Sequence, residues 1–190
     1  FDIDGVDAAH KLAILASLAT GGWVKVEDVH REGLTNLDLW DIKFARRRLG
    51  LVAKSLALAD FNGDEVYARV HTTLIPENHP FATVRNEYNA AVIHGDAVGD
   101  VMFYGKGAGA MPSASAVVSD VMYLARQVAG GMAGRLPYVM FDGKRKLKIL
   151  EPQKRSLRHY LRFSAADRTG ILAAVTQLIS KHDISISSVH

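Results

Sequence analysis

The sequence predicts an α+β fold: a mixed or antiparallel sheet with helices packed on one face, followed by a smaller β-α-β unit. Two pairs of strand patterns follow one another along the chain, each pair joined by a short turn-forming segment, which is typical of antiparallel hairpins. Apolar residues at helical spacing precede and follow these hairpins. A third helical pattern near the C-terminus lies between two β-rich segments, and this order predicts the β-α-β unit.

The first expected helix covers residues 6–20. Asp4 precedes it and is a residue type that caps helix N-termini, and Gly21-Gly22 ends it. Residues 12–19 read LAILASLA and are apolar nearly all round. We therefore expect this helix to be buried rather than amphipathic.

A second helix is expected over residues 37–49, capped by Thr35 or Asn36 and followed by Gly50. Its charges have the signs that the helix dipole favours, because acidic side chains fall in the first turns and basic ones in the last. The acidic residues are Asp38 and Asp41, and the basic residues are Arg46, Arg47 and Arg48.

The first hairpin pairs residues 51–59 with residues 65–74, and Asn62-Gly63 between them is a strong turn signal. Successive side chains of a strand point to opposite faces of the sheet. One face of the second strand holds Val66, Ala68, Val70, Thr72 and Leu74, and the other holds Tyr67, Arg69, His71 and Thr73.

The second hairpin pairs residues 90–94 with residues 98–104 and turns at Gly95-Asp96. A glycine-rich loop follows it and leads into a helix over residues 113–129, whose apolar residues recur at helical spacing. In the C-terminal unit, we expect a helix with its apolar face at 171–179 between strands at 159–164 and 184–189.

Length and composition limit the class of protein. The chain has 190 residues, 48% of them hydrophobic, and is long enough to bury a core without disulfides or structural metals. It contains no cysteine, which excludes a disulfide scaffold, a thiol nucleophile and a cysteine-ligated metal. Its apolar runs are shorter than the roughly 20 residues that span a bilayer, so we expect no membrane partner. Because it opens at Phe1, we expect it to be part of a longer protein.

Basic residues are concentrated in one stretch of the chain. The formal net charge is +3, but residues 130–162 hold nine basic and two acidic side chains among several glycines and prolines. We interpret residues 130–157 as a solvated basic linker between a domain at 1–129 and a module at 158–190. A phosphate-binding patch is the alternative. No helical reader or aromatic stacking motif accompanies the patch, so we expect no nucleic-acid partner.

Three carboxylates and a lysine open the chain: Asp2, Asp4, Asp7 and Lys11. Asp7 and Lys11 are four residues apart, so they project from one face of the first helix. One interpretation is an ordinary ion pair at that spacing. The other is chemical, because Lys11 adjoins the apolar run, which predicts a desolvated ammonium ready for proton transfer.

Residues 105–109 read GKGAG between an expected strand and an expected helix. The spacing is GxGxG rather than GxGxxG, and the preceding strand belongs to a hairpin, so this is not a dinucleotide phosphate loop. A structural turn and a backbone wall against a cofactor both remain open. The eight histidines lack the spacing of a metal motif, and we expect no metal.

Several of these segments together resemble the homoserine dehydrogenase family. Asp2, Ile3, Gly5, Asp7 and Lys11 match the second half of its signature, D-I-x-G-x-D-x-x-x-K. Further similar segments follow in order: VHREGL at 29–34, RVHTTLIPENHPFA at 69–82, HGDAVGDVMFYGKGAG at 94–109 and PSASAVVSD at 112–120. Residues 160–189 resemble the first half of an ACT domain, a small amino-acid-binding regulatory module with a ferredoxin-like fold.

The resemblance implies a cytoplasmic enzyme that interconverts L-aspartate 4-semialdehyde and L-homoserine with NAD(P), on the route to threonine and methionine. It implies that Asp7 holds the substrate and that Lys11 lies beside its reacting oxygen. Asp2 is implied as a further substrate-site residue. A second lysine of the family's site lies before this chain begins. The nucleotide-binding domain would also precede Phe1, so we expect the isolated chain to be inactive.

The resemblance also implies sites outside the first helix. Gly107 and Ser113 would contact the cofactor on its nicotinamide side, and Lys106 stands where the family usually has proline. Gly170 would belong to an effector site, with L-threonine as the effector. A homodimer or a homotetramer is implied.

Two other functions remain as alternatives. A non-catalytic, amino-acid-sensing module would keep its activity without Lys11 and change only its response to threonine. Nucleic-acid binding through residues 130–162 would give an affinity that falls steeply with salt.

Overall fold

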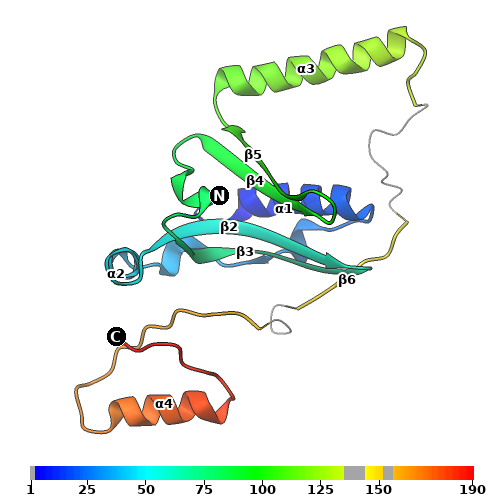
Figure 1. The fold of residues 1–190 in the computed structure, drawn as a ribbon. Helices are drawn as coiled ribbons and strands as arrows, with labels where there is room; N and C mark the ends of the chain where they lie inside the picture. The colour runs from blue at the N-terminus through cyan, green and yellow to red at the C-terminus, as the bar shows by residue number, and fades with distance from the viewer. Residues whose placement is uncertain (1–2, 135–143, 152–155) are drawn as a thin grey trace. The chain divides into compact units, whose positions relative to one another are not determined.

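The computed structural model describes residues 3–134, 144–151 and 156–190 (Figure 1). The chain divides into two compact units, Phe1–Lys154 and Arg155–His190. The first unit contains a mixed sheet and an antiparallel hairpin together with helices, and the second contains one helix. The α+β class is therefore confirmed.

Helix α1 (Val6–Thr20) has the expected bounds but not the expected N-cap. Gly5 occupies the cap position with φ 69°, and no side chain caps the helix. A Cβ at Gly5 would lie 2.9 Å from Cγ1 of Val70, so the backbone passes too close to the sheet for any other residue. The prediction that Asp4 caps α1 is wrong for this reason. Gly21 ends the helix as expected, with φ 70° and its N–H donating to the carbonyl of Ser17.

Only one face of α1 is buried. That face comprises Ala9, Leu12, Ala13, Ala16, Ser17 and Thr20. On the other side, Ile14, Leu15 and Leu18 are 61%, 50% and 44% exposed. The prediction of a helix buried all round is therefore wrong for the part of the chain that the structure describes. The helix has apolar side chains on two faces, and the sheet covers only one of these faces.

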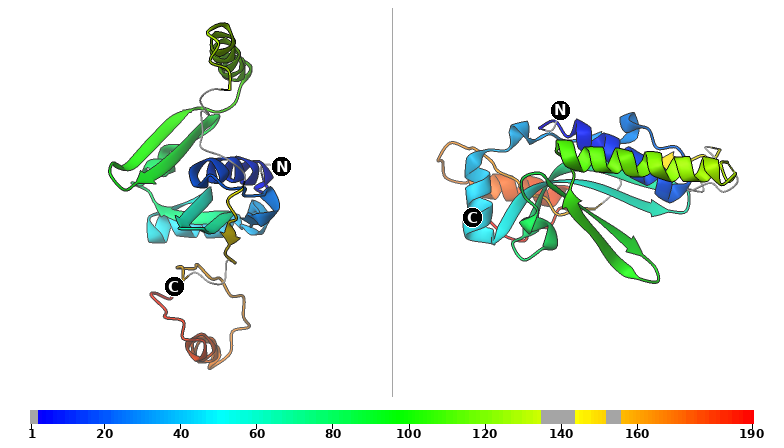
Figure 2. Two further views of the ribbon diagram at one scale, coloured as in Figure 1. Left: turned by 90° about the vertical axis from the view of Figure 1, so that its right-hand side faces the viewer. Right: turned by 90° about the horizontal axis from the view of Figure 1, so that it is seen from above.

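The sheet is built on a long antiparallel pair, β2 (Leu51–Asn62) and β3 (Glu65–Pro76). The predicted hairpin is confirmed, and its two-residue turn is Gly63-Asp64, one position later than the expected turn signal. Two short strands, β1 (His30–Arg31) and β6 (Lys148–Ile149), pair with β3 in parallel. Helix α1 lies over one face of this sheet (Figures 1 and 2). The core forms between them and includes Val66 and Val70 of β3 and the buried face of α1.

Short helical segments connect α1 to the sheet. They are η1 (Val26–Asp28), η2 (Leu34–Asn36), α2 (Leu39–Phe44) and a π-helical turn, η3 (Ala45–Leu49). Asp38 caps α2, because its Oδ1 accepts a hydrogen bond of 2.8 Å from the N–H of Trp40. The predicted cap at Thr35 or Asn36 is wrong, since residues 34–36 form the separate turn η2. Gly50 follows with φ 65°, as expected for a helix end.

The second hairpin and the helix after it are also confirmed, with small shifts. After a 3₁₀ turn, η4 (Pro80–Thr83), β4 (Tyr88–Gly95) pairs antiparallel with β5 (Gly99–Lys106). The next helix, α3 (Ala110–Ala129), begins three residues earlier than expected. No residue of β4, β5 or α3 is buried. No helix of the described residues is long and apolar enough to cross a membrane.

Residues 144–151 are not a solvated linker, as the sequence suggested for them, but part of the sheet. Besides the β6–β3 pairing, the N–H of Leu150 donates to the carbonyl of Val66. Leu147 and Ile149 pack against the core. The glycine- and proline-rich composition of this stretch did not indicate these contacts, which join residues about 80 positions apart. Residues 135–143 and 152–155 of the predicted linker lie outside the described residues.

In the second unit, the predicted helix is confirmed as α4 (Ile171–Lys181). The predicted strands at 159–164 and 184–189 do not form, because these described residues make no ladder. In a split β-α-β unit the two strands flank a third one rather than each other. Without that strand the backbone groups of both segments lack a partner in a sheet, so only the helix, which bonds within itself, is formed.

Candidate active site

The opening motif places an ion pair at the start of α1. The Oδ2 atom of Asp7 lies 2.6 Å from Nζ of Lys11, as the four-residue spacing predicts. The side chain of Lys11 is 57% exposed and that of Asp7 48% exposed. The prediction that Lys11 is desolvated is therefore wrong for the described chain, because the apolar residues that follow it do not enclose its ammonium.

Three segments that are distant in sequence meet at the entrance of α1. The N–H of Leu34 donates to the carbonyl of Ile3 over 2.9 Å, and Gly33 approaches Asp4 so closely that a Cβ there would lie 3.3 Å from its Cα. The N–H of Glu32 donates to the carbonyl of Val70, which is the residue that contacts Gly5. The chain before Asp7 is thus held by β3 and by the loop after β1.

The exposed apolar face of α1 continues directly from the ion pair. At 3.6 residues per turn, Ile14, Leu15 and Leu18 fall within about 100° of Asp7 and Lys11 around the helix axis. A carboxylate and an ammonium therefore stand at one end of an uncovered apolar stripe. Exposed apolar surface of this kind, next to polar groups, is typical of an interaction site.

The predicted cofactor residues lie at the root of α3. Gly107 follows β5, and its N–H donates to the carbonyl of Glu87 over 3.0 Å. Gly109 has φ 116° and ψ 151°, a conformation that only glycine adopts readily. Ser113 is in the first turn of α3 and donates its N–H to the carbonyl of Gly109.

Residues 107–109 of this loop carry no side chain larger than a methyl group. Asn89 lies against Gly107, because a Cβ added at that glycine would overlap the Asn89 side chain. Strand β5 is half of an antiparallel hairpin, as expected, and this excludes the strand–loop–helix arrangement of a parallel dinucleotide-binding unit.

The remaining predicted residues are placed as follows. Gly170 is the N-cap of α4 with φ 88°, a left-handed conformation that favours glycine. A groove of about 540 Å³ lies along α4, between Thr176, Gln177 and Ser180 on the helix and the segment Ile184–Ile186, and Gly170 is not among its lining residues. Asp2 lies outside the described residues. Among the described residues, no group of three or more His, Asp or Glu side chains could hold a metal ion.

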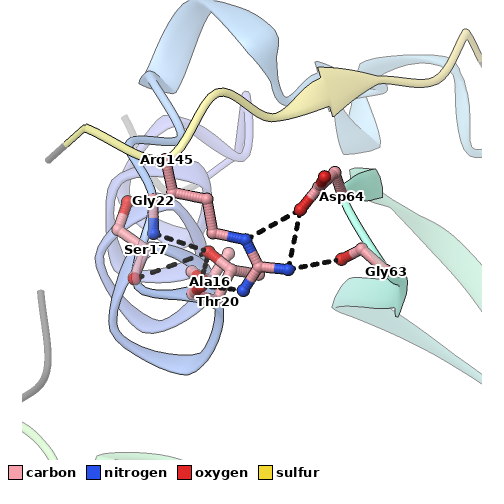
Figure 3. Close-up of polar contacts among 7 residues, drawn as sticks. All are labelled: Ala16, Ser17, Thr20, Gly22, Gly63, Asp64 and Arg145. Carbon is pink, nitrogen blue, oxygen red and sulfur yellow. Dashed lines mark hydrogen bonds and ion pairs between the residues drawn. The ribbon is translucent and has the colours of Figure 1, made fainter.

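Arg145, which the sequence analysis did not single out, makes a structural contact with the C-terminal end of α1 (Figure 3). Its guanidinium donates from Nη1 to the carbonyl of Thr20 over 2.6 Å, from Nη2 to the carbonyl of Gly63 and from Nε to Asp64. The last turn of α1 has no basic residue of its own, although the helix dipole favours one there. The absence of a basic residue at this helix end was the only feature of the sequence that could have indicated a contact from a distant arginine.

Comparison with known proteins agrees with the arrangement of these segments. The family model described as homoserine dehydrogenase matches residues 1–122, and the model described as ACT domain matches residues 159–190. The chain belongs to the homoserine dehydrogenase family. The first match includes α1 and the loop before α3, so it contains the predicted substrate and cofactor residues, whereas Gly170 lies within the ACT match.

The most similar relatives are bacterial proteins named homoserine dehydrogenase. The Synechocystis sp. protein is 41% identical over 194 residues, covering 99% of this chain and 45% of that protein, and the Neisseria gonorrhoeae protein is 38% identical over 191 residues, covering 100% and 44%. Among solved structures, a homoserine dehydrogenase from Thiobacillus denitrificans superposes with a TM-score of 0.83 at 35% identity, over 99% of this chain and 44% of that one. The chain thus spans less than half the length of these relatives.

Proposed function

We propose that this chain is the substrate-binding part of an enzyme that interconverts L-homoserine and L-aspartate 4-semialdehyde with NAD(P). The observation that carries the proposal is the Asp7–Lys11 pair at the head of an uncovered apolar helix face. The relatives' printed name supports the same reaction. The alcohol and aldehyde differ by a hydride and a proton, so the site must hold the oxygen from which the proton leaves.

Lys11 suits the reacting oxygen. A bound nicotinamide supplies the acceptor and donor of hydride. As the aldehyde is reduced, negative charge develops on its oxygen, and the Nζ of Lys11 stabilises this charge and donates a proton to it. In the oxidation of the alcohol, the neutral amine accepts that proton. A second lysine of the family shares this task by resemblance, so Lys11 is one of two ammonium groups at the oxygen.

Asp7 suits the other end of the substrate. Its carboxylate already accepts from Lys11 over 2.6 Å and keeps the ammonium in one rotamer. A carboxylate has acceptor capacity for more than one donor, so Asp7 can also bind the substrate's ammonium group. Asp2, which precedes the Gly5 turn, extends the acidic lining in this proposal.

The apolar stripe on α1 explains how the pair loses its water. A nucleotide-binding domain joined before residue 1 would cover Ile14, Leu15 and Leu18 and bring the cofactor to the glycine loop that contains Gly107, near Ser113. Excluding water would strengthen the electrostatic interactions of Lys11. The same enclosure explains why the 190 residues alone should turn over poorly.

The whole enzyme is proposed to be cytoplasmic and oligomeric, and L-threonine is proposed to act on the α4 unit at Gly170.

The test replaces Lys11 in the enzyme that joins this chain to its nucleotide-binding domain. With L-homoserine and NADP⁺, Lys11→Met should lower kcat by about 100-fold or more, which is the range for loss of a general acid. Asp7→Asn should mainly raise the KM for homoserine. Arg46→Gln, which removes the exposed Arg46–Glu77 ion pair, is the matched control and should leave kcat within about twofold.

The possible outcomes separate the candidate functions. Full activity of Lys11→Met, or normal dehydrogenase kinetics of the isolated 190 residues, would contradict the proposal. If Lys11→Met kept its activity and changed only the response to L-threonine, the amino-acid-sensing alternative would be favoured.

A further inference from the structure

The glycine loop before α3 is held from one side by Glu87, which directly precedes β4, and by Asn89 in β4. Glu87 binds it twice: its carbonyl accepts from the N–H of Gly107, and its carboxylate pairs with Lys106, with Oε1 3.1 Å from Nζ. Asn89 closes over Gly107, because a Cβ at that glycine would overlap the Asn89 side chain. The loop therefore leaves β5 in a conformation that its neighbours on β4 determine.

Lys106 is itself fixed by two contacts. Its ammonium lies 5.7 Å from the ring centre of Tyr88, within the range of a cation–π interaction, and Tyr88 stacks on Tyr104 at 5.0 Å. A hydrogen bond from its own backbone and the ammonium of Lys106 lower the pKa of Glu87, so the carboxylate stays ionised at neutral pH. Both partners of the ion pair are therefore charged at neutral pH.

Stabilisation of the whole fold is a weak explanation for this pair. The side chains of Lys106 and Glu87 are 50% and 43% exposed, and exposed ion pairs contribute little to stability. The position of the pair in the chain indicates its role better, because Lys106 directly precedes Gly107, Ala108 and Gly109. Glycine residues have wide backbone freedom, so a contact at the first residue of a glycine loop restricts the loop's conformations. The same contact adds little to the stability of the domain.

We infer that Glu87 and Lys106 are positioning residues that hold the Gly107–Gly109 loop in the conformation that receives the nicotinamide cofactor. The inference rests on the proposed function, because it concerns the cofactor side of the same site. It assigns a task to Lys106, which stands where the family usually has proline. A proline would restrict the backbone by its ring, whereas Lys106 restrains the loop through a side-chain pair with Glu87.

The test uses Lys106→Met and Glu87→Gln in the enzyme that includes its nucleotide-binding domain. Lys106→Met keeps the apolar stem over Tyr88 and removes only the ammonium. Each variant should raise the Kd for NADPH, measured by its fluorescence on binding, by about two- to fivefold, the range that an exposed ion pair supports. The kcat and the KM for homoserine should stay within about twofold.

Hydrogen exchange gives a second measurement that needs no cofactor. The amide of Gly107 should exchange faster in both variants, because its acceptor is the carbonyl of Glu87. Lys106→Arg keeps the ion pair and the contact with the ring, so it should restore both the Kd and the exchange rate.

The same hairpin supplies a matched control. His94 and Asp100 form a more exposed pair at the other end of β4 and β5, with side chains 76% and 72% exposed and Nδ1 2.6 Å from Oδ1. Asp100→Asn removes a pair from the same hairpin, should change hairpin stability no more than Lys106→Met does, and should leave the Kd for NADPH unchanged.

The inference is overturned if Lys106→Met and Glu87→Gln bind NADPH as the wild type does, or if Asp100→Asn weakens binding equally. An effect of Lys106→Met without one of Glu87→Gln would mean that the lysine touches the cofactor directly, which also contradicts a positioning role. A wild-type enzyme that neither binds NADPH nor oxidises homoserine would instead refute the proposed function.

Discussion

Two regions of the first unit were predicted from equally clear patterns but differ in how they are held. The sheet β1-β3-β2 packs against α1, and Val66 and Val70 are completely buried between them. The hairpin β4–β5 and the helix α3 have no buried residue, and apolar side chains such as Phe103 and Val121 are 59% exposed. Periodicity therefore predicts which element forms, whereas burial depends on whether another segment of the chain covers it.

The largest expected effect tests this difference directly. Val70→Ala removes two methyl groups from a fully buried site next to Gly5, and it should lower the free energy of unfolding by about 2 kcal/mol. Val121→Ala on α3 is the matched substitution, and its effect should stay within about 0.5 kcal/mol. Urea denaturation of both variants measures the two values. Equal losses would mean that α3 is as well packed as the sheet, contrary to the comparison.

A smaller effect should come from the polar contact that closes the packed region. Arg145→Met removes three hydrogen bonds that tie residues 144–151 to α1 and to the turn between β2 and β3. We expect a loss of about 1–2 kcal/mol, with faster hydrogen exchange at the C-terminal end of α1. Lys146→Met removes a neighbouring positive charge in the same segment and should have almost no effect. If the two variants behaved alike, general charge rather than the Arg145 contacts would hold the segment.

The smallest effect concerns the exposed hairpin and depends on pH. The pKa of Glu87 is lowered from its ordinary value of about 4.5 by its backbone hydrogen bond and by Lys106. A carboxyl whose pKa is lower in the folded state stabilises that state above its unfolded pKa, and this contribution is lost as the pH falls through the lower, folded value. The difference in Tm between wild type and Glu87→Gln should therefore be constant from pH 7 to about pH 5 and shrink as the pH falls further, through the lowered pKa of Glu87. A difference that grew on acidification would have the wrong sign.

The elements that could be predicted from the sequence are those with a repeating pattern. Helix α1, both hairpins, α3 and α4 appear within a few residues of their expected positions. The strands β1 and β6 could not be predicted, because two residues carry no alternation. Their pairing is decided by β3, which offers an unpaired edge to whichever segments the chain brings there.

Within the candidate site, the spacing of Asp7 and Lys11 predicted their contact, because a helix places residues four apart on one side. Their exposure could not be predicted in the same way, because a run of apolar residues does not show which faces of the helix other segments will cover. The cap at Gly5 was missed for a related reason. Sequence preference favours Asp4 there, but the closeness of Val70 decides the backbone conformation, and that contact joins residues more than 60 positions apart.

The contact between Arg145 and Thr20 also has a meaning for the order of events during synthesis. The two residues are 125 positions apart, so a ribosome that makes about 5–20 residues per second exposes the end of α1 on the order of 10 s before its partner. During that interval the nascent helix has its apolar sides but neither the strand that follows Arg145 nor the guanidinium that closes its last turn. The newly made segment therefore stays incompletely packed during this interval, and its apolar surface is then most accessible to a chaperone.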